Sequence, residues 1–234
     1  MPDPGPSELA PPESLFARLR EAAGATWRRY VEHDFVRGLA TASLPEPSFR
    51  HYLGQDYLFL VHLARAYALA AYKADGLREM RDAAAGMSAI LDVEMGLHVK
   101  YCAGWGLDEE GMAALPEASA TLAYTRYVLE AGQRGDLLDL YTALAPCVVG
   151  YAEIGARLAG DPETVRAGNP YAEWIETYAG EEYQTVARDH VAALDRLWRA
   201  RAGGGRFDVL ARTFTQATRL EIDFWQMGLD ALAP

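Results

Sequence analysis

The sequence is poor in cysteine and in the signals that mark β-structure. Two cysteines in 234 residues, Cys102 and Cys147, are too few for a disulfide scaffold, so we expect free thiols in a reducing cytoplasm. Few stretches alternate apolar and polar residues, and no Asn-Gly or Asp-Gly pair separates two β-branched runs. Alanine, leucine, arginine and glutamate, which favour helices, are abundant instead. The sequence therefore predicts an all-α fold.

Positive charge and long hydrophobic runs are also scarce. The 22 Lys and Arg against 33 Asp and Glu give a net charge of −11. Such a surface repels phosphate backbones and anionic lipids, so we expect neither nucleic acid nor membrane as a partner. The chain has no uninterrupted apolar run of about 18 residues, the length that a membrane-spanning helix needs.

The first 13 residues, MPDPGPSELAPPE, differ in composition from the rest. They lack the basic region and apolar core of a signal peptide, which agrees with a cytoplasmic location. Their proline, glycine, serine and acidic residues predict a disordered leader over residues 1–13. Half of all residues are hydrophobic, enough for a single helical domain over residues 14–234.

Apolar residues recur at helical spacing along most of the chain, separated by glycine- and proline-containing breaks. We expect seven or so helices, with GWGLDEEGMAALPE as a loop or short irregular helix; the predicted helices cover roughly residues 14–34, 47–73, 77–102, 117–131, 136–158, 171–201 and 207–232. Helices of this length with short links form a bundle around one core. A small-ligand pocket between the helices is then a common arrangement.

Asp56 falls in the middle of the apolar face of the second predicted helix, between Tyr52 and Phe59. A buried carboxylate without partners is costly, so it needs hydrogen-bond donors or a ligand. Spacing alone does not choose between a ligand-binding acid and a structural aspartate capped by tyrosines or an amide.

Glu221 occupies the same kind of position in the last predicted helix, on a face shared with Phe214 and Phe224. Burial should raise its pKa, which suits a proton donor near neutral pH. The alternative is a buried ion pair with an arginine.

Cys147 lies on the inner face of the fifth predicted helix, directly after Pro146. Proline cannot donate to the carbonyl of Thr142, so we expect a kink that exposes backbone N–H groups. A thiol near such groups has a lowered pKa and is more nucleophilic. The alternative is an unreactive thiol in the core.

Tyrosines also lie at positions that could line a pocket: Tyr124, Tyr127, Tyr151 and Tyr178. A tyrosine offers a stacking face and a polar tip, so such walls suit a flat heteroaromatic ring that carries an amino group. Each of them could equally bridge core and solvent.

Glu94 and His98 are spaced one helical turn apart and could share a metal or simply form a hydrogen bond. Di-iron bundles need a second such pair, and the other histidines, at 33, 51, 62 and 190, are scattered. P-loop, GxGxxG and HExxH patterns are missing as well. We therefore expect no metal and no cofactor.

Taken together, six segments resemble the TenA family, known as thiaminase II or aminopyrimidine aminohydrolase. The resemblance runs from about Leu15 to Leu232 and is carried by FRHYLGQDYLFLVHLARAYA, VEMGLHVKY, ATLAYTRYVL, LAPCVVGYAEIG, NPYAEWIETYAGEEY and LEIDFWQMG. The proline–cysteine pair is similar to the cysteine-bearing branch of that family. The resemblance implies a heme-oxygenase-like helical bundle without heme, usually assembled as a homotetramer.

The resemblance also implies roles for individual residues. Asp56 matches the carboxylate that binds the amino group and adjacent ring nitrogen of a pyrimidine, Cys147 the nucleophile, and Glu221 the glutamate that protonates the ring. The substrate-binding positions that match are Tyr124, Tyr151 and Tyr178. Phe59 departs from the pattern, because relatives often carry tyrosine there, which removes one hydroxyl group and keeps the ring.

The implied reaction converts 4-amino-5-aminomethyl-2-methylpyrimidine, and thiamin as a second candidate substrate, into 4-amino-5-hydroxymethyl-2-methylpyrimidine. Three other functions stay open: a thiamin- or pyrimidine-binding protein without catalysis, a helical oxidase of the same superfamily, and a regulatory protein. The acidic chain shows no recognisable DNA-binding helix, so it gives regulation by DNA binding no physical support.

Overall fold

The computed structural model describes residues 9–231, and within them every regular element is helical. The elements are α1 (Leu15–Ala23), α2 (Ala25–Val31), α3 (Asp34–Ala40), α4 (Glu46–Lys73), α5 (Leu77–Ala89), the π-helical η1 (Ile90–Glu94), α6 (Met95–Gly104), α7 (Glu109–Ala113), α8 (Ser119–Arg134), α9 (Leu137–Gly160), α10 (Ala172–Ala179), α11 (Glu181–Arg201) and α12 (Arg206–Asp230). The predicted all-α bundle is confirmed.

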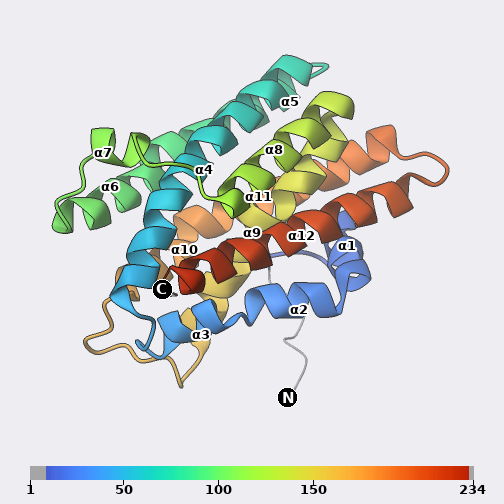
Figure 1. The fold of residues 1–234 in the computed structure, drawn as a ribbon. Helices are drawn as coiled ribbons and strands as arrows, with labels where there is room; N and C mark the ends of the chain where they lie inside the picture. Colours follow the sequence, from blue (N-terminus) through green and yellow to red (C-terminus); the bar gives the residue numbers. More distant parts are fainter. Residues whose placement is uncertain (1–8, 232–234) are drawn as a thin grey trace.

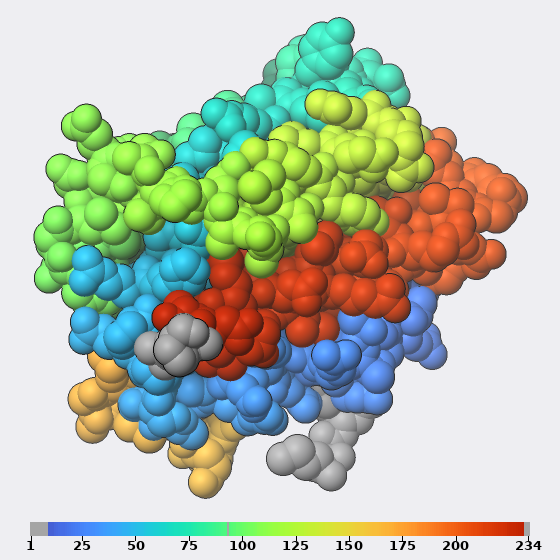
Figure 2. Space-filling view, in the orientation of Figure 1, coloured from blue at the N-terminus to red at the C-terminus, as the bar shows by residue number. Residues whose placement is uncertain are grey.

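The most buried helix is α9, and it lies at the centre of the bundle. It packs against α8, α10, α11 and α12, while α4 packs against α5, α8 and α12. Figure 1 shows the long helices following a common diagonal, with α1–α3 along one edge and α5–α7 along the opposite edge. Figure 2 shows α8 and α12 closely packed over the front of the molecule. Side chains on α9 therefore face the interior in almost every direction.

Local sequence signals explain where the helices begin. Ser14 caps α1, because its hydroxyl oxygen accepts a hydrogen bond from the Ala17 N–H at 3.1 Å. At α9, the Asp136 side chain accepts from the N–H of Asp139, whose own side chain accepts from the Asp136 N–H. This reciprocal capping box starts the central helix at a defined residue.

Three of the predicted helices are interrupted in the structure. The first is divided at Gly24, whose φ of 50° is costly for other residues, and again before α3. The segment 171–201 is divided at Gly180, which has an extended backbone. The segment 77–102 is helical throughout but passes through the π-helical η1, and the predicted loop after it contains α7.

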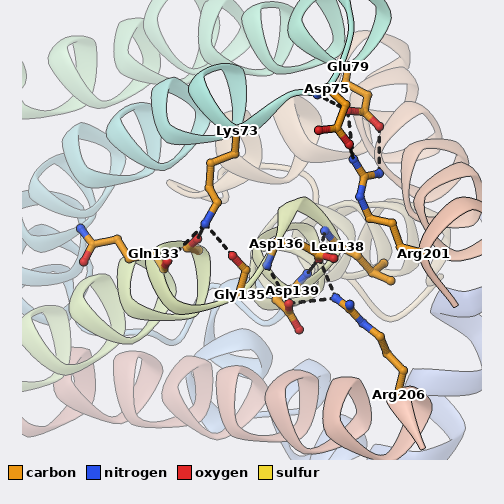
Figure 3. Close-up of polar contacts among 11 residues, drawn as sticks. Lys73, Asp75, Glu79, Gln133, Gly135, Asp136, Leu138, Asp139, Arg201 and Arg206 are labelled. Atoms are coloured by element: carbon orange, nitrogen blue, oxygen red, sulfur yellow. Dashed lines mark hydrogen bonds and ion pairs between the residues drawn. The ribbon is translucent and has the colours of Figure 1, made fainter. Parts of the chain in front are cut away.

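Charged side chains tie the helix ends together at one end of the bundle (Figure 3). Lys73 at the end of α4 donates to the carbonyl oxygens of Gly132 and Gly135, at 2.6 and 2.5 Å, and so caps the end of α8. Arg201 of α11 pairs with Glu79 of α5 at 2.9 Å, and Arg206 of α12 pairs with Asp136 at 2.6 Å. These ion pairs tie α11 to α5 and α12 to the start of α9.

Residues 1–8 of the predicted leader lie outside the described residues, and Leu9 and Ala10 are buried in the core. Helix α9 is long and apolar enough to cross a membrane, although polar residues interrupt its apolar sequence.

However, 94% of its most apolar 18-residue stretch is buried inside the bundle, as expected of a core helix.

Candidate active site

Cys147 lies in the middle of α9, where it is 6% exposed. The helix continues through Pro146, whose carbonyl oxygen accepts a hydrogen bond from the Tyr30 hydroxyl group at 3.1 Å. Tyr30 can approach because position 150 is glycine: a Cβ there would lie 2.4 Å from the tyrosine ring. The hydroxyl group of Thr142, one turn before Pro146, has no hydrogen-bond partner in the described chain. The backbone around Cys147 is therefore held by α2.

The expected low pKa of Cys147 is wrong for this site without a ligand. Burial raises the pKa of the Cys147 thiol well above its usual value, and the negative charges of Glu221, Glu94 and Asp56 raise it further. The proline in the helix does not offset these effects. Cys147 is thus a neutral thiol until a positive charge comes close to it.

Asp56 of α4 receives hydrogen bonds from two buried side chains. The Tyr52 hydroxyl group donates to Asp56 Oδ2 at 3.0 Å, and His98 Nε2 lies 2.7 Å from the same oxygen. Trp174 of α10 in turn donates to the Tyr52 oxygen at 3.3 Å. Within the described chain all hydrogen bonds to this carboxyl group fall on Oδ2, so Oδ1 is left for another donor.

The partners of His98 define where its protons lie. Its Nδ1 is 2.8 Å from the carbonyl oxygen of Glu94, which only accepts, so Nδ1 carries a proton. One further proton lies between Nε2 and the Asp56 carboxyl group. Burial lowers the pKa of His98, but the hydrogen bond and charge of Asp56 outweigh it, and the net pKa is raised. The hydrogen bond and charge of Asp56 thus favour the protonated form of His98, against the effect of burial.

Glu221 of α12 faces the same region with a different protonation state. Its Oε1 accepts a hydrogen bond from the Tyr124 hydroxyl group at 2.8 Å. Burial raises the pKa of Glu221 well above its usual value; the Tyr124 hydrogen bond lowers it and the charge of Asp56 raises it. The expected rise is confirmed in direction, and among the described residues no arginine pairs with Glu221. Burial is thus the main reason why Glu221 is a weaker acid than a free glutamate.

Aromatic rings surround these groups. Phe59 packs on Tyr124, with ring centroids 4.8 Å apart, and on Phe224 at 5.7 Å. Tyr151 contacts Tyr178 at 5.0 Å, and its oxygen lies 3.5 Å from that of Tyr52. Of the predicted tyrosines only Tyr127 lies elsewhere: it is half-buried and donates to the carbonyl oxygen of Thr213 at 3.3 Å.

Sequence reasoning left open whether Glu94 and His98 share a metal or form a hydrogen bond, and the structure shows His98 Nδ1 donating to the Glu94 carbonyl oxygen. The Glu94 carboxyl group accepts from the Tyr178 hydroxyl group at 3.3 Å, while His98 points to Asp56. Burial, together with the Asp56 charge, raises the pKa of Glu94 to about 8, although His98 and Tyr178 oppose the rise. Among the described residues no group of three His, Cys, Asp or Glu side chains is arranged to hold a metal.

The structure brings the predicted acids, the thiol and the aromatic residues into one buried region. The charges of Asp56 and Glu221 both act on Cys147, and Asp56 also acts on Glu221. Two buried carboxyl groups therefore lie near one thiol, inside walls of tyrosine and phenylalanine. This arrangement suits a flat ring with an amino group to bind and a nitrogen to protonate.

Comparison with known proteins shows to which family the chain belongs. The sequence profile of the TENA/THI-4/PQQC family matches residues 20–231. The chain belongs to this family. A Haemophilus influenzae protein, itself uncharacterised, is 42% identical over 92% of this chain and 99% of its own length. The aminopyrimidine aminohydrolase of Halalkalibacterium halodurans is 37% identical over 92% of this chain and 95% of its own length.

Solved structures of the TENA/THI-4/PQQC family share the fold. A Silicibacter protein described as a TenA family transcription regulator has a TM-score of 0.87 and 44% identity, covering 94% of this chain and 97% of that one. A TenA homologue from P. horikoshii has a TM-score of 0.83 and 27% identity, covering 93% and 99%. The predicted membership of the TenA family is confirmed.

Proposed function

We propose that this TenA-family chain is an aminopyrimidine hydrolase of thiamin salvage. Its substrate would be 4-amino-5-aminomethyl-2-methylpyrimidine, with thiamin as a second candidate, and its product 4-amino-5-hydroxymethyl-2-methylpyrimidine. Relatives named aminopyrimidine aminohydrolase support this, at 37% identity in Halalkalibacterium halodurans and 28% in Bacillus subtilis.

One observation carries the proposal: two carboxyl groups, one bound by Tyr52 and His98 and the other by Tyr124, meet a thiol in one buried aromatic region. Asp56, fixed by Tyr52 and His98, would accept the hydrogen bond of the exocyclic amino group on its Oδ1. Phe59 and Tyr124 would pack against the ring. This fixes the ring before any bond changes, which lowers the entropic part of the barrier.

Glu221 would then donate its proton to a ring nitrogen and make the ring electrophilic. The new positive charge next to the thiol opposes the effects that raise the pKa of Cys147, so a thiolate can form. The thiol proton would pass to the Glu221 carboxylate that the first step leaves. The thiolate would then add to the ring carbon beside the substituted carbon, and the electron pair would expel ammonia or the thiazole. Water then adds to the exocyclic methylene and the thiolate leaves, which divides one difficult displacement into easier steps.

The other functions predict different products. A binding protein would retain the ring without changing it, and an oxidase would consume oxygen. The description of the Silicibacter relative as a transcription regulator applies to that protein. Incubation of the purified chain with the aminomethyl pyrimidine and mass spectrometry of the products separates these cases. We expect the hydroxymethyl pyrimidine and one equivalent of ammonia; an unchanged pyrimidine that stays bound would contradict hydrolysis.

The predicted homotetramer and cytoplasmic location rest on the resemblance and the composition alone. Sedimentation equilibrium measures the first directly. A tetramer of the 25.7 kDa chain is the expected species.

A further inference from the structure

A second cavity lies between α5 and α11, outside the region just described. It has a volume of about 250 Å³, close to the lower end of ligand-binding pockets, which begin at roughly 300 Å³. Side chains of four helices line it, among them Tyr67 of α4, Asp82 and Gly86 of α5, Tyr141 of α9, and His190 and Arg196 of α11.

The inner wall of this cavity is aromatic and neutral. Tyr141 packs edge-on against Tyr67, with ring centroids 6.3 Å apart, and stacks on His190 at 5.0 Å. His190 Nε2 donates to the carbonyl oxygen of Tyr141 at 3.0 Å, so Nδ1 is an acceptor. Burial lowers the pKa of His190 to about 4, which keeps the ring neutral. The outer rim carries the ion pair between Asp82 and Arg196.

The cavity and Cys147 share a neighbour, because Tyr67 lines the cavity and the charge of Cys147 acts on its hydroxyl group. Tyr141 precedes Cys147 by six residues on α9, a rise of about 9 Å along the helix axis. On α11, Tyr183 packs on Tyr178 of the active site at 4.7 Å, and His190, two turns later on the same face, lines the cavity. The cavity and the active site are thus consecutive along two helices.

Tyr67 is the side chain that separates them. It lines the cavity, and the charges of Cys147 and Glu94 act on its hydroxyl group. Gly86 lets the ring lie against α5, since a Cβ there would be 2.3 Å from a ring carbon. In the described chain the Tyr67 hydroxyl group makes no hydrogen bond. The ring is held by packing alone, so it can swing without breaking a polar contact.

A second hollow offers a competing route. It lies between α6, α10 and α11 and is lined by Gly96, Glu173, Glu176 and Tyr183. On that side two side chains intervene: Tyr183 packs on Tyr178, and the Tyr178 hydroxyl group is bound to Glu94 at 3.3 Å. Opening it would break a buried hydrogen bond, which Tyr67 does not have to do.

We propose that the cavity between α5 and α11 is the vestibule of the active site, through which a small heteroaromatic amine passes Tyr67 to reach Cys147. The chemical class of this ligand rests on the proposed function, but the route does not. The aromatic wall receives the ring, and the carboxylate of Asp82 and Nδ1 of His190 offer acceptors to an amino group.

The test measures access to the thiol. Ala85 is exposed and lines the cavity, so Ala85→Trp fills the mouth; Ala84→Trp adds the same ring at an exposed position outside the lining. Gly96→Trp fills the second hollow, since a Cβ at Gly96 meets no atom within 4 Å. Iodoacetamide modification of Cys147 is followed by peptide mass spectrometry, with Cys102 as the internal reference and equal gel-filtration volumes for all variants.

Ala85→Trp is expected to slow the modification of Cys147 relative to Cys102 about tenfold, while Ala84→Trp and Gly96→Trp leave it unchanged. Slowing by Gly96→Trp alone would place the entrance at the second hollow and overturn the proposal. An unchanged rate in Ala85→Trp would overturn it too. As a second measurement, Tyr67→Ala should speed the modification, and Tyr67→Phe should not.

The same variants separate this proposal from the proposed function. If the chain hydrolyses no pyrimidine but the modification rates follow the expected order, the route stands and the chemistry fails. If the chain hydrolyses the pyrimidine and Ala85→Trp changes neither the modification rate nor KM, the chemistry stands and the vestibule fails.

Discussion

The two carboxyl groups of this site, Asp56 and Glu221, have different hydrogen-bond partners. Asp56 Oδ2 accepts a hydrogen bond from the Tyr52 hydroxyl group and lies 2.7 Å from His98 Nε2. Glu221 accepts one hydrogen bond, from Tyr124, and burial together with the charge of Asp56 raises its pKa. The first environment suits a group that positions a ligand, and the second suits a proton donor.

If Glu221 is the proton donor, Glu221→Gln should lower kcat by about 10²–10⁴-fold and change the dissociation constant of the product little. Gln keeps the shape and can still accept from Tyr124, but it has no acidic proton. Stopped-flow turnover and calorimetric binding measure the two effects separately. An equal loss of binding and turnover would make Glu221 a binding residue only.

His98 should act through Asp56. His98→Gln removes the imidazole that binds Asp56 Oδ2 at 2.7 Å, so Asp56 is positioned less firmly and we expect KM to rise about tenfold. His62→Gln is the matched control, because His62 binds Glu117 at 3.0 Å and does not contact the site. Steady-state kinetics decide: an unchanged KM in His98→Gln removes this role.

Residue types and spacing singled out the three central side chains as candidates, because a polar group on an apolar helical face needs partners or a ligand, and the family resemblance supplied their roles. They did not reveal that His98 pairs with Asp56, since the two residues lie on different helices and only packing brings them together. They also gave the wrong direction for Cys147. Its pKa depends on the carboxyl groups of three other elements, which no local pattern contains.

At the scale of elements, close approach of helices positions the tyrosines. Gly155 lets α10 pack directly on α9, because a Cβ there would lie 2.5 Å from the backbone carbon of Tyr178 and 2.7 Å from the nitrogen of Ala179. This contact sets the distance of the Tyr178 ring from Tyr151. Position 155 of α9 thus requires glycine, because α10 packs directly against it.

Gly155→Ala should therefore push α10 outward and destabilise the fold by roughly 1–3 kcal/mol. Gly160→Ala, at the end of the same helix, meets no atom within 4 Å and should stabilise the chain by up to about 1 kcal/mol through helix propensity. Urea unfolding of both variants measures the difference. A Gly155→Ala variant as stable as Gly160→Ala would show that the helices are not in contact here.

Helix existence was predictable and helix continuity was not. The periodicity of residues 171–201 continues across Gly180, yet the chain bends there, so that Tyr178 and Tyr183 can pack on each other at 4.7 Å. The insertion at η1 places Glu94 opposite Tyr178, and a π-helical turn has no signature in apolar spacing. Tertiary contacts, and not the local sequence, determine the break at Gly180 and the π-helical turn at η1.

For the whole molecule, burial of acids couples the site to the stability of the fold. Glu94 has a pKa of about 8 in the folded chain, well above its usual value of 4.5. Between these two values the unfolded chain releases a proton that the folded chain keeps. The contribution of Glu94 to stability is therefore full below about pH 4.5 and is lost as pH rises to about 8.

Glu94→Gln removes this titration, so its free energy of unfolding should fall less between pH 5 and pH 8 than that of the natural chain. Glu130→Gln is the control, because Glu130 is exposed and pairs only with Arg134. Urea titrations at both pH values give the comparison. Identical pH dependence in the natural chain and Glu94→Gln would show that Glu94 is ionised in the folded state.

The central claim is that the buried thiol of the bundle performs covalent catalysis, and the turnover of Cys147→Ser tests it most directly. The aminomethyl pyrimidine is the substrate, and Cys102→Ser is the matched control, since Cys102 is the other buried free thiol. We predict a loss of at least about a thousandfold in kcat for Cys147→Ser and an unchanged rate for Cys102→Ser. A Cys147→Ser variant that turns over like the natural chain would contradict the account.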